Sequence, residues 1–211
     1  MRGFYDPGEF ACLAPIVNAK DEIVNELNNY RNDDMFFKFS ADFKDENVVE
    51  NVIGTWVAAQ FYYRKSGSHK IHAPNFNAIF DRNGGDKNQL KRKWIKYLRL
   101  APKLLPKTYK ILESVNEVYW SGMSKIQANS EIKSHKHKFR VPTLTFQICL
   151  SPSSGNCVLT LNNEKVKWGD VGQMMLFDGR LEHDLINDSP DSRTIMHMEI
   201  DPTGHPDYKW Y

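Results

Sequence analysis

The spacing of apolar residues changes about halfway along the chain. Between residues 20 and 31, apolar side chains recur at helical spacing, which predicts a helix. A second helical stripe runs through 87–116, where Pro102 and Pro106 break or restart the helix. We therefore interpret residues 1–117 as helix and loop.

From Glu117 onward the period becomes two, which predicts strands separated by turn residues such as Asn162-Asn163. The predicted strands cover 119–127, 131–137, 143–150, 156–161, 164–168, 173–178, 183–187 and 193–200. Eight closely spaced strands are typical of an antiparallel sandwich or jelly roll. We expect a mostly β fold with flanking α-helices and one domain over 1–211. In that domain the helical and loop half, 1–117, packs on a jelly-roll core, 118–205.

Composition and charge indicate a globular protein. The chain has 211 residues, 41% of them hydrophobic and 26% charged, with a formal net charge of +2. It has no long uncharged apolar run and no secretory signal pattern, so we expect no membrane partner. Three cysteines do not make a disulfide framework, which favours a reducing, cytoplasmic location. Two of them, Cys149 and Cys157, flank a predicted turn and could face each other across a hairpin, although we expect simply two buried thiols in a sheet.

Residues 87–110 contain many lysines and arginines and no acidic residue. A basic helix can dock phosphates, but it is more often a solvated face balanced by acids elsewhere. We therefore do not expect a nucleic-acid partner.

The histidines suggest a metal site. His135 and His137 are two residues apart within a predicted strand, so their side chains would share one face. His183 begins a later strand that a jelly roll can bring alongside. Imidazole suits iron, zinc, copper and nickel. His197, on the last predicted strand, could line a cavity, although we expect a hydrogen-bonded core histidine.

Several segments resemble the aspartyl/asparaginyl β-hydroxylase family. They are PKTYKILE (106–113), SKI (124–126), SEIKSH (130–135), CVLTL (157–161) with the following Trp168 and Gly172, and FDGRLEHDLIN (177–187). Arg193 stands ten residues after His183, where the family keeps an arginine. The segment GTW (54–56) is similar to an upstream tryptophan motif of the family. The likeness covers about half of the chain.

The resemblance implies a double-stranded β-helix, a cupin-like jelly roll, with the chemistry of an Fe(II)- and 2-oxoglutarate-dependent dioxygenase. It implies that His135 and His183 bind the metal. It also implies that Arg193 holds the far carboxylate of 2-oxoglutarate, with Ser124 as its hydroxyl partner. A planar guanidinium matches a carboxylate in shape and charge. Dioxygen and a small-molecule or peptide substrate would be the other reactants.

Two departures from the family pattern matter. The arginine and histidine with which relatives help to hold the cosubstrate are replaced by Thr145 and Gln147. Gln147 stays a candidate cosubstrate contact, and Lys138 or Arg140 could supply the missing charge. Some relatives have glycine, and others an aspartate ligand, at the position of His137. We expect His137 to complete a three-histidine site, although it could instead point outward.

Three functions remain open. The first is a 2-oxoglutarate-dependent hydroxylase acting on a C–H bond of an aspartyl or asparaginyl residue, a free amino acid or a lipid acyl chain. The second is a 2-oxoglutarate-independent iron dioxygenase with three histidines, in which Arg193 holds the substrate's own carboxylate. The third is a jelly-roll binding module without turnover, which the replacements at Thr145 and Gln147 favour.

Overall fold

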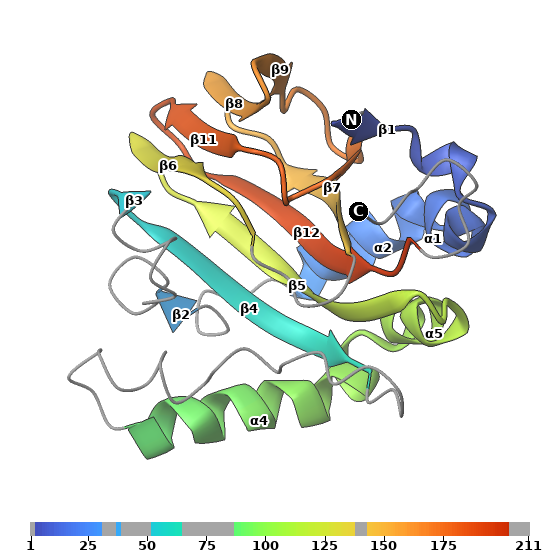
Figure 1. Ribbon diagram of the computed structural model, residues 1–211. Coiled ribbons are helices and arrows are strands. Elements are labelled where there is room, and N and C mark those ends of the chain that lie inside the picture. Colours follow the sequence, from blue (N-terminus) through green and yellow to red (C-terminus); the bar gives the residue numbers. More distant parts are fainter. Residues whose placement is uncertain (1–2, 31–36, 39–51, 65–86, 138–142, 203–211) are drawn as a thin grey trace.

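The computed structural model describes residues 3–30, 37–38, 52–64, 87–137 and 143–202 (Figure 1). Their helices are α1 (Ala14–Asn18), α2 (Lys20–Tyr30), α4 (Lys87–Leu104) and α5 (Pro106–Ser114). The strands of the first half are β1 (Phe4–Tyr5), β2 (Phe37–Lys38), β3 (Val52–Ile53) and β4 (Trp56–Tyr63). Those of the second half are β5 (Val118–Ile126), β6 (Ser130–His135), β7 (Leu144–Ser151), β8 (Asn156–Leu161), β9 (Glu164–Lys167), β10 (Met174–Phe177), β11 (His183–Asp188) and β12 (Arg193–Ile200).

The described strands form two antiparallel sheets that face each other. The larger sheet has the order β1-β10-β7-β12-β5-β4-β2, and the smaller has the order β3-β6-β11-β8-β9. Strands distant in sequence, such as β5 and β12, are neighbours, as a jelly roll requires. The prediction of a mostly β fold with flanking helices is confirmed. The eight strands predicted in the second half all appear, with ends that differ from the prediction by at most two residues.

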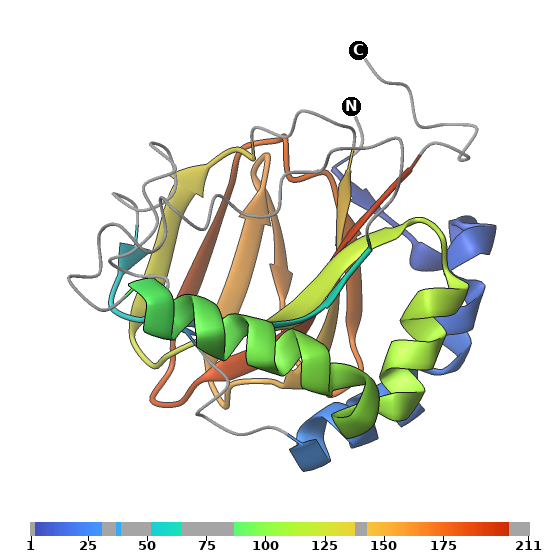
Figure 2. The ribbon, with the colours of Figure 1, turned by 90° about the horizontal axis from the view of Figure 1, so that it is seen from below.

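Two separate cores explain why the central strands of the larger sheet are almost continuously buried. One core lies inside the roll, between the sheets, and includes Ile126, Trp168 and Ile195. The other lies between the outer face of the larger sheet and the helices, which Figure 2 shows gathered on one side of the roll. Burial on both faces is what parallel sheets usually show, and here the helices impose it on an antiparallel sheet.

The first half contributes more β structure than we expected. Reading residues 1–117 as helix and loop is wrong for β4, an eight-residue strand that pairs with β5 and extends the larger sheet. Its close approach requires Gly122, because a Cβ there would lie 2.4 Å from the backbone oxygen of Ala59. The helix predicted over 87–116 is divided at Pro106, whereas Pro102 lies inside α4. Residues 203–205 of the predicted core lie outside the described residues.

Cys149 and Cys157 do not lie across a hairpin from each other, whereas the expectation of two buried thiols on strands is confirmed. Cys149 lies on β7 in the larger sheet, and Cys157 lies on β8 in the smaller one. Both thiols are free and buried, and both belong to the core inside the roll. The chain between them therefore crosses from one sheet to the other.

Candidate metal centre and carboxylate site

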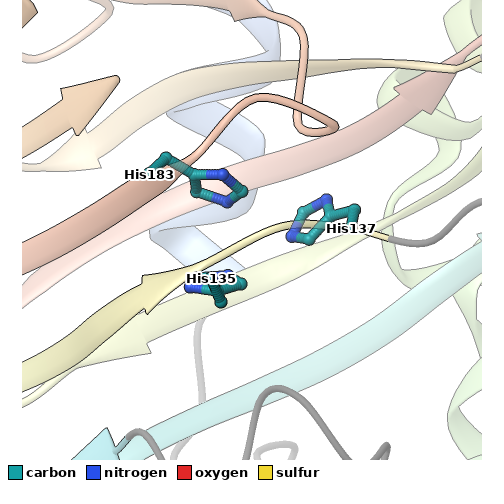
Figure 3. A group of neighbouring side chains, drawn as sticks. All are labelled: His135, His137 and His183. Atoms are coloured by element: carbon teal, nitrogen blue, oxygen red, sulfur yellow. The ribbon is translucent and has the colours of Figure 1, made fainter. Parts of the chain in front are cut away.

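Three histidines meet inside the roll at one end of β6 and β11. His135 is the last residue of β6, His183 is the first residue of β11, and the two are paired across the smaller sheet. The ring centroids of His135 and His183 are 4.2 Å apart, and those of His137 and His183 are 4.7 Å apart. One ligand nitrogen from each ring lies within 4.8 Å of the others. Figure 3 shows the rings converging from the two chain segments.

His137 reaches this group by a different route from the one we predicted. The strand ends at His135, so His137 does not share a strand face with it. Instead the backbone N–H of His137 donates a hydrogen bond to the carbonyl oxygen of Gly179, at 2.8 Å. That bond ties the segment after β6 to the turn before β11. The imidazole nevertheless points toward His135 and His183 (Figure 3).

The backbone fixes the orientation of two of the rings. Nδ1 of His135 lies 2.9 Å from the carbonyl oxygen of Lys133, and Nδ1 of His183 lies 2.8 Å from that of Leu181. A carbonyl oxygen can only accept, so each Nδ1 carries the proton and donates it. Nε2 of each neutral ring is then left with its lone pair, as a metal ligand needs.

Burial keeps the histidines neutral. It lowers the pKa of His135, lowers that of His183 to about 4 and holds that of His137 well below its ordinary value. The neighbouring imidazoles add to this effect, because a second positive charge would repel the first. At neutral pH all three rings therefore have lone pairs to offer. Three neutral nitrogens suit a divalent ion such as iron, zinc, copper or nickel.

Arg193 is the most unusual charged residue of the core. Its side chain is 1% exposed, and its guanidinium lies 5.5 Å above the ring centroid of Trp168. The thiols of Cys149 and Cys157 are the neighbours with the largest electrostatic effect on it, and burial lowers its pKa. Its Nε is buried and has no hydrogen-bond partner among the described residues. A buried cation without a counter-ion is costly, so the site suits an anion.

Ser124 lies on the same inner face as Arg193. It is opposite Ile195 in the pairing of β5 with β12, whereas Arg193 is opposite Ile126, so the two are close diagonal neighbours. Ser124 Oγ accepts a hydrogen bond from Trp56 Nε1 at 2.7 Å. The indole N–H of Trp56 bonds to a lone pair of Ser124 Oγ. The hydroxyl proton of Ser124 is therefore available to a ligand.

Gln147 is also on this inner face but has a different neighbour. Its Nε2 lies 3.3 Å from His197 Nδ1, on the adjacent strand β12. Thr145 Oγ1 donates to Glu199 at 3.1 Å. His197 is thus a hydrogen-bonded interior residue, as expected. Lys138 and Arg140, the candidate substitutes for the missing charge, lie outside the described residues.

Glu199 is a buried acidic residue that the sequence did not indicate. It is 3% exposed and faces the inside of the roll, in phase with Arg193 along β12. One feature of the sequence could have indicated this inward direction: Glu199 lies six residues after Arg193, an even number, so the two side chains share one face of the strand. An acidic residue on a strand more often points to solvent, so the spacing alone does not distinguish the two faces.

The fold and these side chains define a class: jelly-roll proteins with a candidate metal centre of three histidines and a buried arginine in the same interior. The model of the aspartyl/asparaginyl beta-hydroxylase family matches residues 18–202. The chain belongs to that family. No curated protein matches the chain at a significant level.

Solved structures with a similar fold are distant in sequence. A predicted oxalate decarboxylase from Thermotoga maritima is 11% identical, with a TM-score of 0.41 over 79% of this chain and 91% of that one. A cupin protein from Bacteroides fragilis is 13% identical, with a TM-score of 0.34 over 46% of this chain and 75% of that one. In the part of the chain that the structure describes, no helix is both long and apolar enough to span a bilayer.

Proposed function

We propose that the protein is an Fe(II)- and 2-oxoglutarate-dependent dioxygenase that hydroxylates a C–H bond. The observation that carries this proposal is the combination of three neutral imidazoles, one buried and two half-buried, with a buried arginine that has no acidic partner among the described residues. Membership of the β-hydroxylase family supports it. When bound, Fe(II) and 2-oxoglutarate together activate dioxygen for hydroxylation of the substrate.

The protein's own residues have three tasks in this proposal. His135, His137 and His183 hold the metal and leave its remaining positions to the reactants. Arg193 and the hydroxyl proton of Ser124 bind the far carboxylate of 2-oxoglutarate. The apolar side chains inside the roll, including Phe177 and Leu185, keep water from the reacting atoms.

The 2-oxoglutarate-independent iron dioxygenase remains the second candidate. The structure gives one observation in its favour. Thr145 and Gln147, which replace a cosubstrate-binding arginine and histidine of relatives, already contact Glu199 and His197. They therefore provide no cation for a second contact to 2-oxoglutarate.

Succinate formation separates the two candidates. The protein would be loaded with Fe(II) without oxygen, and its affinity for 2-oxoglutarate measured by calorimetry. Air would then be admitted and succinate quantified. We expect binding and succinate release. Arg193→Met should weaken 2-oxoglutarate binding by at least tenfold, because a hydrogen bond to a charged group contributes roughly 1.5–3 kcal/mol. Arg99→Met, on the exposed face of α4, is the matched control. Oxygen consumption without 2-oxoglutarate binding would favour the second candidate.

A further inference from the structure

The inner face of β12 carries charged and polar residues along its length. Ile195 belongs to the core inside the roll. Arg193, His197 and Glu199 lie two or four residues from it along the strand, so they face the same interior. The intervening Met196, Met198 and Ile200 belong to the core under the helices. His197 and Glu199 thus lie inside the roll together with the metal centre, and not against the helices.

His197 and Glu199 are held in a fixed arrangement. Nε2 of His197 lies 2.9 Å from Oε1 of Glu199, and the same oxygen accepts from Thr145 Oγ1. Gln147 contacts the other ring nitrogen of His197. The ring of Trp120 stacks on the imidazole, with centroids 4.9 Å apart and an interplanar angle of 10°. The Glu199 carboxylate is therefore positioned before any ligand arrives.

One oxygen of this carboxylate has no partner. Glu199 Oε2 is buried and accepts no hydrogen bond from any residue that the structure describes. Leaving a buried carboxylate oxygen unsatisfied is costly, and the cost is largest when the group is charged. A ligand that donates a hydrogen bond to Oε2 would remove this free-energy cost. An ammonium group would do so best, because it also offsets the charge.

This acceptor faces the same interior of the roll as the candidate metal centre. In that centre the ring of His183 packs against Phe177, a residue of the core inside the roll, with ring centroids 5.7 Å apart. Glu199 is not itself one of the grouped ligands, which among the described residues are the three histidines. A molecule bound to Glu199 would therefore share the interior of the roll with the metal without replacing a ligand.

The spacing along β12 indicates that Arg193 and Glu199 serve different molecules. They are six residues apart on one strand, and at about 3.3 Å per residue their backbones are separated by roughly 20 Å. A single small amino acid cannot bridge that distance. If a carboxylate of 2-oxoglutarate occupies Arg193, the donor that reaches Glu199 belongs to the substrate.

We propose that Glu199 Oε2 binds an amine group of the substrate, so that the enzyme acts on a small amine-bearing molecule, with an α-amino acid as the simplest example. This inference rests on the proposed function, because it assigns the Arg193 end of the roll to the cosubstrate. It selects a free amino compound over an acyl chain, which would leave Glu199 unpaired.

The test is a binding comparison on the Fe(II)- and 2-oxoglutarate-loaded protein without oxygen. Each common L-amino acid and the carboxylic acid that lacks its amine would be titrated by calorimetry. We expect at least one amino acid to bind at least tenfold more tightly than its counterpart. Glu199→Gln, which keeps the shape, should abolish this preference, whereas Glu199→Asp should retain it. Glu164→Gln, on exposed β9, is the control. The affinity for 2-oxoglutarate should stay within twofold in all three variants.

Two results would overturn the assignment: equal binding of every amino acid and its counterpart, or a preference that persists in Glu199→Gln. Failure of the proposed function has a different signature. In that case 2-oxoglutarate would not bind, yet an amine preference that depends on Glu199 could still be measured in the protein loaded with Fe(II) alone.

Discussion

The ring of His137 occupies the space that a side chain at Gly179 would need. A Cβ at Gly179 would lie 2.5 Å from Nδ1 of His137, and the carbonyl oxygen of Gly179 accepts the backbone hydrogen bond of His137. The absence of a side chain at Gly179 and the presence of a third histidine are therefore linked in this protein.

Gly179→Ala should displace the His137 ring and weaken iron binding by at least tenfold. The methyl group overlaps the ring, and relief requires the ring or the turn to move. Iron affinity of the anaerobic protein is the measurement. Gly169→Ala is a suitable control, since its Cβ would meet only Gln173 at 3.9 Å.

A double variant isolates the cause. In a His137→Gly background the same Gly179→Ala change should have little further effect, because the clashing ring is gone. An equal loss of iron affinity in both backgrounds would mean that Gly179 acts through the turn and not through His137.

Ser124→Ala should weaken 2-oxoglutarate binding by about tenfold, since it removes one hydrogen bond to a charged group. Iron affinity should be unchanged, because Ser124 is not among the grouped ligands. Calorimetry with Ser114→Ala, an exposed serine on α5, as the control measures the effect. Unaltered 2-oxoglutarate affinity would mean that Ser124 does not contact 2-oxoglutarate and serves only to accept the hydrogen bond from Trp56.

Gly122→Ala should destabilise the fold by about 1–3 kcal/mol, the usual cost of overpacking. The added methyl group would press on the backbone of β4, which cannot move without breaking its ladder with β5. Urea denaturation of Gly122→Ala and the parent protein gives the free energy of unfolding. An unchanged midpoint would show that the two strands are less closely packed than described.

The sequence predicts the second half well because its strands combine period-two segments with strong turn residues. It misses β4, whose buried and half-buried positions do not alternate regularly, since α4 contacts the strand from outside while its other face lines the roll. His135 and His183 could be predicted, because pairing of β6 with β11 brings them together. The route of His137 through the turn at Gly179 and the inward direction of Glu199 depend on tertiary contacts that no local pattern encodes.

The most direct test of the metal centre is an anaerobic Fe(II) titration of the parent protein alongside His135→Ala, His137→Gly and His183→Ala. Equimolar iron should bind to the parent. Each variant should lose more than tenfold in affinity, because water must replace an imidazole that the fold holds in place. Unchanged iron affinity in His137→Gly alone would leave a two-histidine site. Unchanged affinity in all three variants would contradict the assignment of this histidine group as the metal centre.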